Sequence, residues 1–378
     1  MRTILSSLAA LLLAAPCLAN AQTTVQSTSA PEIAFDGADF LKLPKDMYLG
    51  EVAGVAFNAK NGHVFVFQRG NTHGPAYGAA AAQLLEFDQT GRFVREIGQG
   101  LYAWSFAHAV RIDPEGNIWA VDKGSDMVIK FNPEGKVIMV FGRKPEASDE
   151  GAHPLQHPRP PLPAVDGYFR QVTDVAWDSR GNGYISDGYI NSRVAKVDKN
   201  GKWLKSWGTY GKEPGQFDTL HSIAIDAQDH IYVADRGNRR IQVFDTEGTL
   251  LKIIEINIAP PADAQPAIGA RPELGPSGYS GSGVGTMMPG APWALCITPA
   301  SKGTQYLYVS DAFPGRVYKL DLNGKVLGWL GGAGKQWKQF GWIHEIACPS
   351  ENELYVGELL NWRLQKLTLH PGHADVSP

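Results

Sequence analysis

A strand-rich unit recurs six times between about residue 48 and residue 369. Each copy contains roughly four short strands of alternating or apolar character, separated by turns such as Pro133-Glu134-Gly135 and Lys199-Asn200-Gly201. This length and pattern are typical of the blades of a β-propeller. The sequence therefore predicts an all-β fold, a single six-bladed β-propeller. Representative copies read GNIWAVDKGSDMVIKFNPEGKVIMVFG, GNGYISDGYINSRVAKVDKNGKWLKSWG and DHIYVADRGNRRIQVFDTEGTLLKIIE, and the more divergent first copy contains GHVFVFQRG.

The composition suits one large β domain. The chain has 378 residues, of which 43% are hydrophobic and 42 are glycine, enough for a substantial core with many turns. The repeat runs through residues 48–369 without a linker, so these residues form one predicted domain, preceded by a segment at 22–47 and followed by a tail at 370–378. The last copy shows only three strands of its own. We therefore expect residues 32–47, especially 38–43, to supply its outer strand and close the ring.

The N-terminus has the pattern of an export signal at residues 1–21. Arg2 precedes an apolar run, Leu8 to Ala15, which is too short to span a bilayer, and Ala19-Asn20-Ala21 resembles a cleavage site. The pattern predicts a periplasmic or secreted protein. Removal of one arginine leaves 34 basic against 38 acidic residues. This slight acidic excess argues against nucleic acid or an anionic membrane surface as partners.

Two cysteines, Cys296 and Cys348, follow the predicted cleavage site. They lie in the inner-strand segments of the fifth and sixth copies, but their registers differ by one residue. An exported location permits a disulfide between them, but because successive side chains of a strand point to opposite faces, the two thiols should point apart, and this geometry argues against the bond.

Two segments depart from the repeat pattern. Residues 144–168 are proline-rich, and residues 259–290 are rich in Gly, Pro, Ala and Ser. Both are expected to be irregular loops on one rim, and disorder is the alternative interpretation of the second. His153 and His157, in the first loop, are expected to be solvated rather than metal ligands.

Residues that recur at one register indicate architecture. An acid recurs near the end of the second strand of the copies, and an arginine recurs before the third strand. Both are expected to hold turns or neighbouring blades. The acids are Asp122, Asp187, Asp235, Asp311 and Glu358, and the arginines are Arg193, Arg239 or Arg240, Arg316 and Arg363.

Histidine, in contrast, occupies the first slot of the inner strand in every second copy only. Because alternate copies of a closed ring of six lie about 120° apart, His108, His221 and His344 should converge on the central channel. A structural requirement shared by all blades would not alternate in this way. Three neutral imidazoles with an open fourth position are the ligand set of catalytic zinc, although iron, copper and manganese also fit the donor type. From the first to the sixth copy, the slot reads Ala53, His108, Thr173, His221, Trp293 and His344.

A second slot, directly after the recurrent acid, also breaks the repeat. In the second and fourth copies this slot lies 15 residues after the histidine. An up-and-down hairpin returns the end of its second strand to the face where the first began, so Arg69, Arg236 and Tyr189 should lie on the histidine face. Cations beside a phenol and a metal suit an enzyme that acts on an anionic substrate. The slot reads Arg69, Lys123, Gly188, Arg236, Ala312 and Leu359, and Tyr189 follows Gly188.

The successive motifs GVAFNAKNGHVFVFQRG, FAHAVRID, YISDGYINSR, FDTLHSIAID, VADRGNRRIQVF and WIHEIA resemble those of the peptidyl-α-hydroxyglycine α-amidating lyases. That family consists of six-bladed propellers of the NHL-repeat group, and the resemblance covers nearly all of residues 48–369. It implies a catalytic zinc on His108, His221 and His344. It also implies an active site lined by Arg69, Arg236 and Tyr189.

The resemblance implies a structural calcium as well. Val55 and Val110 match the positions whose carbonyls bind the ion, and Glu345 stands where the family has aspartate. Trp342 replaces a methionine near the metal, which should reshape the substrate pocket. The family's cysteine beside the tyrosine is Ile190 here.

The resemblance implies cleavage of the N–C bond of a carbinolamide, giving an amide and glyoxylate, a reaction of peptide amidation. In this reading the metal polarises the hydroxyl, Tyr189 takes its proton, and Arg69 or Arg236 holds the carboxylate. The substrate would be a small molecule or a peptide. The alternatives are a propeller hydrolase of the lactonase type and a non-catalytic NHL-repeat binding module. The sequence specifies no oligomeric state.

Overall fold

The computed structural model describes residues 23–70, 82–144, 163–272 and 285–370. The predicted export signal, most of the proline-rich loop with His153 and His157, part of the Gly/Pro/Ala/Ser-rich segment and nearly all of the C-terminal tail lie outside the described residues.

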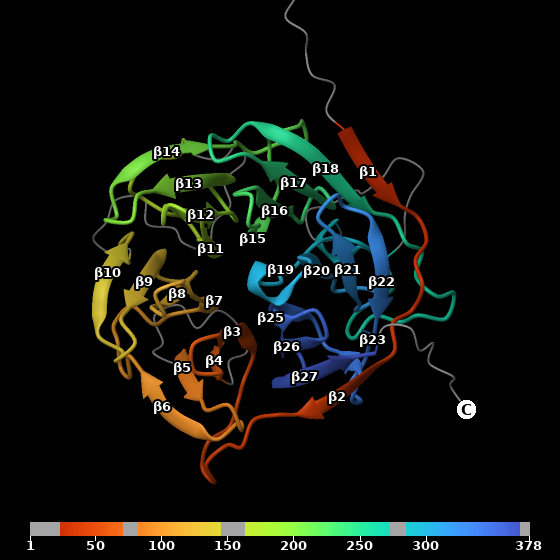
Figure 1. Cartoon of the computed structure of the whole chain (residues 1–378), viewed down its shortest axis with the longest axis horizontal. Coiled ribbons are helices and arrows are strands. Elements are labelled where there is room, and N and C mark those ends of the chain that lie inside the picture. Colours follow the sequence, from red (N-terminus) through yellow and green to blue (C-terminus); the bar gives the residue numbers. More distant parts are fainter. Residues whose placement is uncertain (1–22, 71–81, 145–162, 273–284, 371–378) are drawn as a thin grey trace, which may run out of the picture.

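Six antiparallel sheets surround one axis, and the first strand of each repeat lies innermost (Figure 1). The predicted all-β, six-bladed propeller is confirmed. Within each repeat, consecutive strands pair with one another and run from the axis to the rim. The strands of blades one to three are β3 (Val52–Asn58), β4 (His63–Gln68), β5 (Gln83–Phe87), β6 (Phe93–Ile97), β7 (Ala107–Ile112), β8 (Ile118–Asp122), β9 (Met127–Phe131), β10 (Val137–Phe141), β11 (Asp174–Trp177), β12 (Gly183–Asp187), β13 (Arg193–Val197) and β14 (Trp203–Trp207). Those of blades four to six are β15 (Leu220–Ile225), β16 (Ile231–Asp235), β17 (Arg240–Phe244), β18 (Leu250–Ile256), β19 (Leu295–Ile297), β20 (Tyr306–Ser310), β21 (Val317–Asp321), β22 (Val326–Leu330), β25 (Ile343–Ser350), β26 (Glu353–Glu358) and β27 (Arg363–Leu369).

The remaining elements are short. Strands β23 (Gly332–Ala333) and β24 (Gln339–Phe340) pair in parallel between blades five and six, and two 3-10 turns span Gly285–Met287 and Ala300–Lys302. Within the described ranges, no helix has the length and apolar character needed to cross a membrane.

The N-terminal segment forms a strap, residues 23–42, along the outer edges of four blades (Figure 1). Strand β2 (Phe35–Asp39) pairs with β27 and completes blade six, as predicted, although it lies at the start of the expected region. Strand β1 (Thr23–Ser27) adds a fifth, parallel strand to blade four, which the sequence did not predict. Between them the Ile33 N–H donates to the Trp329 carbonyl of blade five, and farther along the Lys42 N–H donates to the Gly91 carbonyl of blade one.

Gly91 is needed where the strap meets blade one. Its φ is +80°, and a Cβ on this residue would lie 1.8 Å from the Phe40 carbonyl oxygen. Any side chain would therefore push the strap away from the blade.

The recurrent acids hold the turns before the inner strands, as predicted. The Asp235 carboxylate accepts hydrogen bonds from the backbone N–H of Asp218 and from the side chains of Asn238 and Arg240. Arg193 and Arg363 donate to Asp187 and Glu358 in the same way. These carboxylates are fully buried, and this network of donors satisfies them without water.

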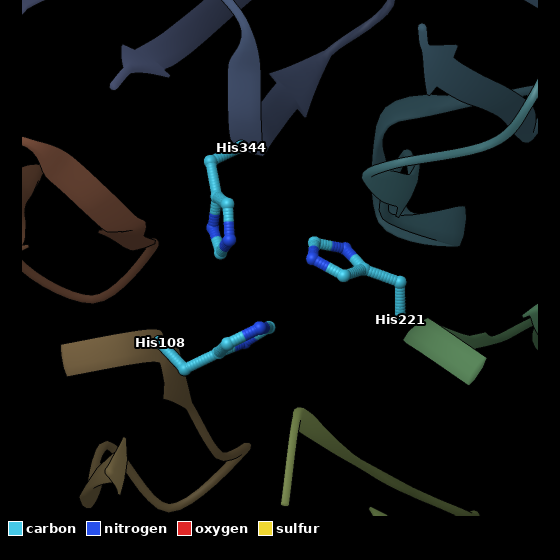
Figure 2. Close-up of side chains that lie close together, drawn as sticks. All are labelled: His108, His221 and His344. Carbon is cyan, nitrogen blue, oxygen red and sulfur yellow. The ribbon is translucent and has the colours of Figure 1, made fainter. Parts of the chain in front are cut away.

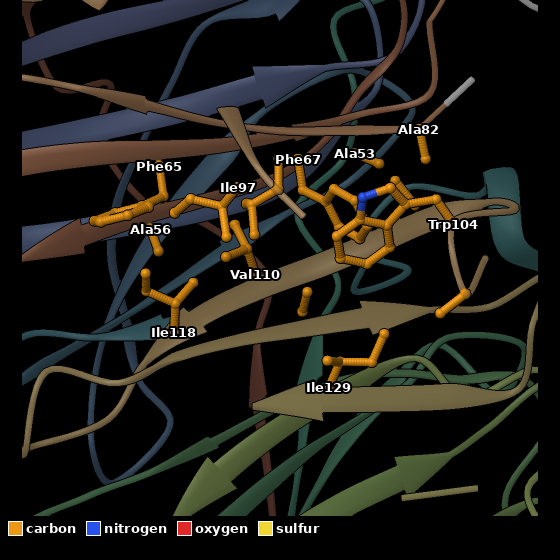
Figure 3. Close-up of a cluster of buried hydrophobic side chains, with 14 of the residues drawn as sticks. Ala53, Ala56, Phe65, Phe67, Ala82, Ile97, Trp104, Val110, Ile118 and Ile129 are labelled. Carbon is orange, nitrogen blue, oxygen red and sulfur yellow. The ribbon is translucent and has the colours of Figure 1, made fainter. Parts of the chain in front are cut away.

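The hydrophobic core is divided among the six interfaces between neighbouring blades, with one apolar cluster at each. Figure 3 shows the cluster between blades one and two. There the Trp104 ring lies 4.8 Å from the Phe67 ring and 6.0 Å from the Phe131 ring, measured between centroids. Trp104 is 1% exposed, so it is a packing residue.

Cys296 and Cys348 form a disulfide, with their Cα atoms 6.0 Å apart, so the expectation that they would not pair was wrong. The two cysteines do differ by one residue in strand register, as the sequence indicated. Adjacent blades, however, pack with the opposite faces of their sheets toward each other. Cys296 points from blade five toward blade six with Ala294, whereas Cys348 points from blade six toward blade five with Ile346. An offset of one residue is therefore what brings the two thiols into the same interface.

Candidate active site and metal centre

His108, His221 and His344 converge on the axis of the ring, as the alternating slot predicted (Figure 2). Their potential ligand nitrogens all lie within 4.8 Å of one another. The three ring centroids are 4.5 to 4.8 Å apart, and all three side chains are buried.

Each histidine sits at a β-bulge, which explains its direction. The pairing of β7 with β8 shifts between Ala107 and Ala109, on either side of His108. Equivalent shifts flank His221 in β15 and His344 in β25. A residue at a bulge leaves the regular up-down alternation of the strand, and its side chain can be aimed along a new direction. In all three blades, that direction is the axis of the ring.

The odd-numbered blades orient these imidazoles. The Nδ1 atoms of His108, His221 and His344 lie 2.6 to 2.7 Å from the carbonyl oxygens of Thr173, Trp293 and Ala53, which are the slot residues of blades three, five and one. A carbonyl only accepts, so each Nδ1 carries the proton and each Nε2 presents a lone pair.

The Nε2 atoms fit a metal ion. Those of His108 and His221 are buried and have no hydrogen-bond partner within the described part of the chain. Burial lowers the pKa of all three histidines well below the usual range, and the neighbouring positive charges lower it further. Neutral imidazoles with a carbonyl on the far nitrogen are the usual ligands of a transition metal.

Tyr189 lies beside this centre, at the end of the second strand of blade three. Its ring centroid is 5.7 Å from the His108 ring and 5.9 Å from the His221 ring. Its hydroxyl accepts a hydrogen bond of 3.3 Å from Nη2 of Arg236. Gly188 permits this position, because a Cβ there would lie 1.7 Å from the Leu220 carbonyl oxygen.

The charges around Tyr189 favour its phenolate form. Burial alone would raise the pKa of Tyr189, but the positive charges of Arg236, Lys123 and Arg69 outweigh it and lower the pKa. Arg236 is 6% exposed, and its buried Nε has no hydrogen-bond partner in the described ranges.

Arg69 is held more firmly than Arg236. Its Nη1 lies 2.9 Å from a Glu51 carboxylate oxygen, its Nε donates to the Ala107 carbonyl, and its guanidinium stacks 3.9 Å from the Phe106 ring centroid. The structure therefore brings Arg69, Arg236 and Tyr189 to the histidine face, as predicted from the second slot.

Lys123 is a further residue of this site that the sequence argument did not select. It occupies the same slot as Arg69 and Arg236, and that shared register was the available signal. Its Nζ lies 3.9 Å from the centroid of the Tyr189 ring.

Trp342 lies on the other side of the centre, through Trp293. The two indole rings are 5.5 Å apart, and the Trp293 ring is 5.5 Å from that of His221. Trp342 has a φ of +59°, in the region that bulky residues rarely adopt. Two residues later the chain reaches His344, so this turn contributes to the placement of the ligand.

The residues expected to bind calcium instead form hydrogen bonds with one another and, through Glu345, an ion pair with Arg111. One Glu345 oxygen accepts hydrogen bonds from the N–H groups of Val55 and Val110, and the other lies 2.8 Å from Nη2 of Arg111. The Arg111 guanidinium also makes two hydrogen bonds to Asp174, at 2.9 and 2.6 Å. These residues do not fit a calcium ion, because a protein cation already neutralises the carboxylates and both oxygens of Glu345 are engaged.

Arg111 connects the inner strands of the whole ring. From blade two, it contacts Asp174 of blade three and Glu345 of blade six, and Glu345 in turn binds Val55 of blade one. Nη2 of Arg111 also lies 3.4 Å from Ser222 Oγ in blade four and 3.3 Å from the Leu295 carbonyl in blade five.

Sequence comparisons support the resemblance noted above. The family model for the NHL repeat matches residues 217–244, which contain His221 and Arg236. The chain is 30% identical to the peptidylglycine alpha-amidating monooxygenase of Rattus norvegicus over 221 residues, 52% of this chain and 21% of that protein. It is 29% identical to a probable peptidyl-alpha-hydroxyglycine alpha-amidating lyase of Caenorhabditis elegans over 213 residues, 52% of this chain and 56% of that protein. It is also 30% identical to NHL repeat-containing protein 3 of Mus musculus, over 53% of this chain and 54% of that protein. The chain thus spans about a fifth of the rat protein and about half of the other two.

Solved structures share the fold. The virginiamycin B lyase of Staphylococcus aureus superposes with a TM-score of 0.53 over 90% of this chain and 100% of that one, at 12% identity. At this identity the likeness concerns the propeller architecture alone.

Proposed function

We propose that the protein is a metal-dependent carbon-nitrogen lyase that cleaves an α-hydroxyglycine-like carbinolamide into an amide and glyoxylate. The observation that carries the proposal is the convergence of three buried histidines beside a tyrosine hydroxyl bonded to Arg236. A hydrolase of the lactonase type would typically gather carboxylates and amides around its metal. A binding module would have no use for three buried histidines that face one point, two of which have an unpaired ring nitrogen within the described residues.

His108, His221 and His344 would hold the metal, for which we propose zinc. When bound, zinc supplies a Lewis acid for the substrate hydroxyl. The chain itself provides the proton transfers. The Tyr189 phenolate accepts the hydroxyl proton, the C–O bond becomes a carbonyl, and the electrons of the breaking C–N bond pass to nitrogen. Tyr189 then returns the proton to that nitrogen, so the reaction balances without a co-reactant.

The arginines would bind the carboxylate next to the reacting carbon. Arg236 has an unsatisfied, buried Nε, and an arriving carboxylate supplies the acceptor that it lacks. Arg69 is already paired with Glu51, so we assign it mainly to the electrostatics around Tyr189.

We also propose that the chain is exported, to a periplasm or to the medium. The Cys296–Cys348 disulfide supports this location, because disulfides persist in oxidising compartments.

The direct test is glyoxylate release from an N-acyl α-hydroxyglycine by zinc-loaded protein. Wild type should release glyoxylate well above the uncatalysed rate. Tyr189→Phe should reduce kcat by roughly 10²-fold or more with zinc content unchanged, because it removes the proton acceptor and leaves the three histidines in place. Absence of glyoxylate release at saturating zinc would reject the lyase proposal, and lactone hydrolysis by the same sample would favour the hydrolase alternative.

A further inference from the structure

Lys123 carries a cation that forms no ion pair with a carboxylate in the described part of the protein. It follows Asp122 at the end of β8, in the same blade as His108. Its Nζ contacts aromatic faces only, at 3.9 Å from the Tyr189 centroid and 5.1 Å from the Phe106 centroid. No hydrogen bond or ion pair of this ammonium group occurs among the described residues. Burial lowers the pKa of Lys123, which reflects the cost of keeping this charge away from water.

The acids near Lys123 are engaged elsewhere. Asp122 accepts hydrogen bonds from the N–H groups of Ser105 and Phe106, and Asp126 accepts one from the N–H of Gln171. Glu51 pairs with Arg69. The site therefore has positive charge in excess on the side of Lys123 and Arg236.

Lys123 and Arg236 occupy equivalent positions in blades two and four. Each lies 15 residues after the histidine of its own blade, and Tyr189 lies in the blade between them. The corresponding slots of blades five and six hold Ala312 and Leu359, which are buried and apolar. Trp342 lies on this apolar side, and Trp293 lies between it and Arg236, whose guanidinium carbon is 4.4 Å from the Trp293 ring centroid. At this slot the site is thus cationic in blades one, two and four and apolar in blades five and six.

We propose that Lys123 is a second carboxylate-binding residue, which with Arg236 selects substrates carrying an anionic group on the Tyr189 side and an apolar acyl group on the Trp342 side. This inference rests on the proposed lyase function and specifies its substrate class. An incoming carboxylate would give Lys123 the ion-pair partner that the described residues do not provide. Charge-assisted contacts of this kind are among the strongest hydrogen bonds in proteins.

The test compares Lys123→Met and Lys123→Arg with wild type, using an N-benzoyl α-hydroxyglycine and its uncharged methyl ester. Lys123→Met should raise KM for the acid by roughly 10- to 100-fold, the range expected for a lost charge-assisted contact. KM for the ester should change less than about twofold, and Lys123→Arg should recover most of the affinity for the acid. Lys136→Met is the matched control, because it removes the same charge from an exposed turn of the same blade.

A second readout separates this inference from the lyase proposal. Calorimetric titration with glyoxylate measures carboxylate binding without turnover, and zinc content with near-ultraviolet circular dichroism checks that the variants are intact. If wild type binds glyoxylate but releases none from substrate, the lyase proposal fails, and a roughly tenfold weaker binding by Lys123→Met still supports the inference. Equal KM and equal glyoxylate affinity in wild type and Lys123→Met would overturn it. Equal losses on acid and ester, or no binding of glyoxylate by wild type, would also overturn it.

Discussion

Replacement of Arg111 by methionine tests whether a protein cation has taken the place of a metal ion in the channel. Methionine keeps most of the length of the side chain and removes the charge. The substitution leaves Asp174 and Glu345 buried without their counter-ion, since the exposed fractions of their side chains are 2% and 3%. Breaking a buried ion pair by removing one partner typically costs about 3 to 5 kcal/mol.

This loss converts to a fall in Tm of roughly 4 to 7 °C, from a typical unfolding entropy of about 2.1 cal/mol/K per residue over some 350 residues. Differential scanning calorimetry would measure it. Arg92→Met is the control, because Arg92 forms an exposed pair with Asp88 at the rim and should change the Tm by less than about 1 °C.

Calcium provides the decisive comparison. Millimolar CaCl2 should leave the wild-type Tm unchanged, because Arg111 already neutralises the two carboxylates. The Arg111→Met protein should regain stability when calcium is added, since it exposes free carboxylate and carbonyl oxygens to the ion. A wild-type protein stabilised by calcium, or an Arg111→Met variant as stable as Arg92→Met, would refute the reasoning.

Three further predictions concern the disulfide, the buried acids and the metal ligands. The double variant Cys296→Ser/Cys348→Ser should lose about 4 kcal/mol of unfolding free energy, the value expected for a cross-link spanning 52 residues. If a reductant left the Tm of the wild-type protein unchanged, that result would argue against the disulfide. Burial raises the pKa of Asp126 to about 7, so its contribution to stability is present at low pH and lost as the pH rises toward 7. Asp126→Asn should therefore reduce the fall of the unfolding free energy, measured with urea, between about pH 4 and 7. The reduction is about 1.4 kcal/mol per pH unit at most. A pH dependence equal to that of wild type would contradict the raised pKa. His221→Ala should reduce bound zinc well below one per chain by mass spectrometry of the native protein, whereas full occupancy would exclude His221 as a ligand.

The repeat made most of the fold predictable, because one strand pattern repeated six times permits few architectures. Comparison of equivalent positions in the six copies also made the site predictable. His108, His221 and His344 occupy one position in every second blade, so a structural requirement common to all blades does not explain them. The disulfide was missed because strand alternation was applied without the fact that neighbouring blades face each other with opposite sides. Strand β1 was missed because its parallel pairing with β18 joins segments 229 residues apart, as at Gln26 and Glu255, and leaves no local pattern.

Arg111 shows a different limit of sequence reasoning. Its position identifies a residue of an inner strand, but its role depends on Asp174 and Glu345, which come from two other blades. Only the closed ring places the three together. Lys123 was visible in the second slot, yet its lack of a carboxylate partner among the described residues could be recognised only when the surrounding acids had been placed.

The strap has a consequence for how the chain reaches its native state. Its residues are synthesised before all six blades, yet their partners in β22 and β27 belong to the last two blades, so contacts such as Val326 N–H to Ser27 Oγ close a separation of 299 residues. Until those contacts form, the outer edges of blades four, five and six present unpaired backbone groups, which are templates for another chain. Closure of such long loops is slow. Partly folded molecules should therefore associate through these three edges, and a synthetic peptide of residues 23–42 supplied during refolding should compete with that association.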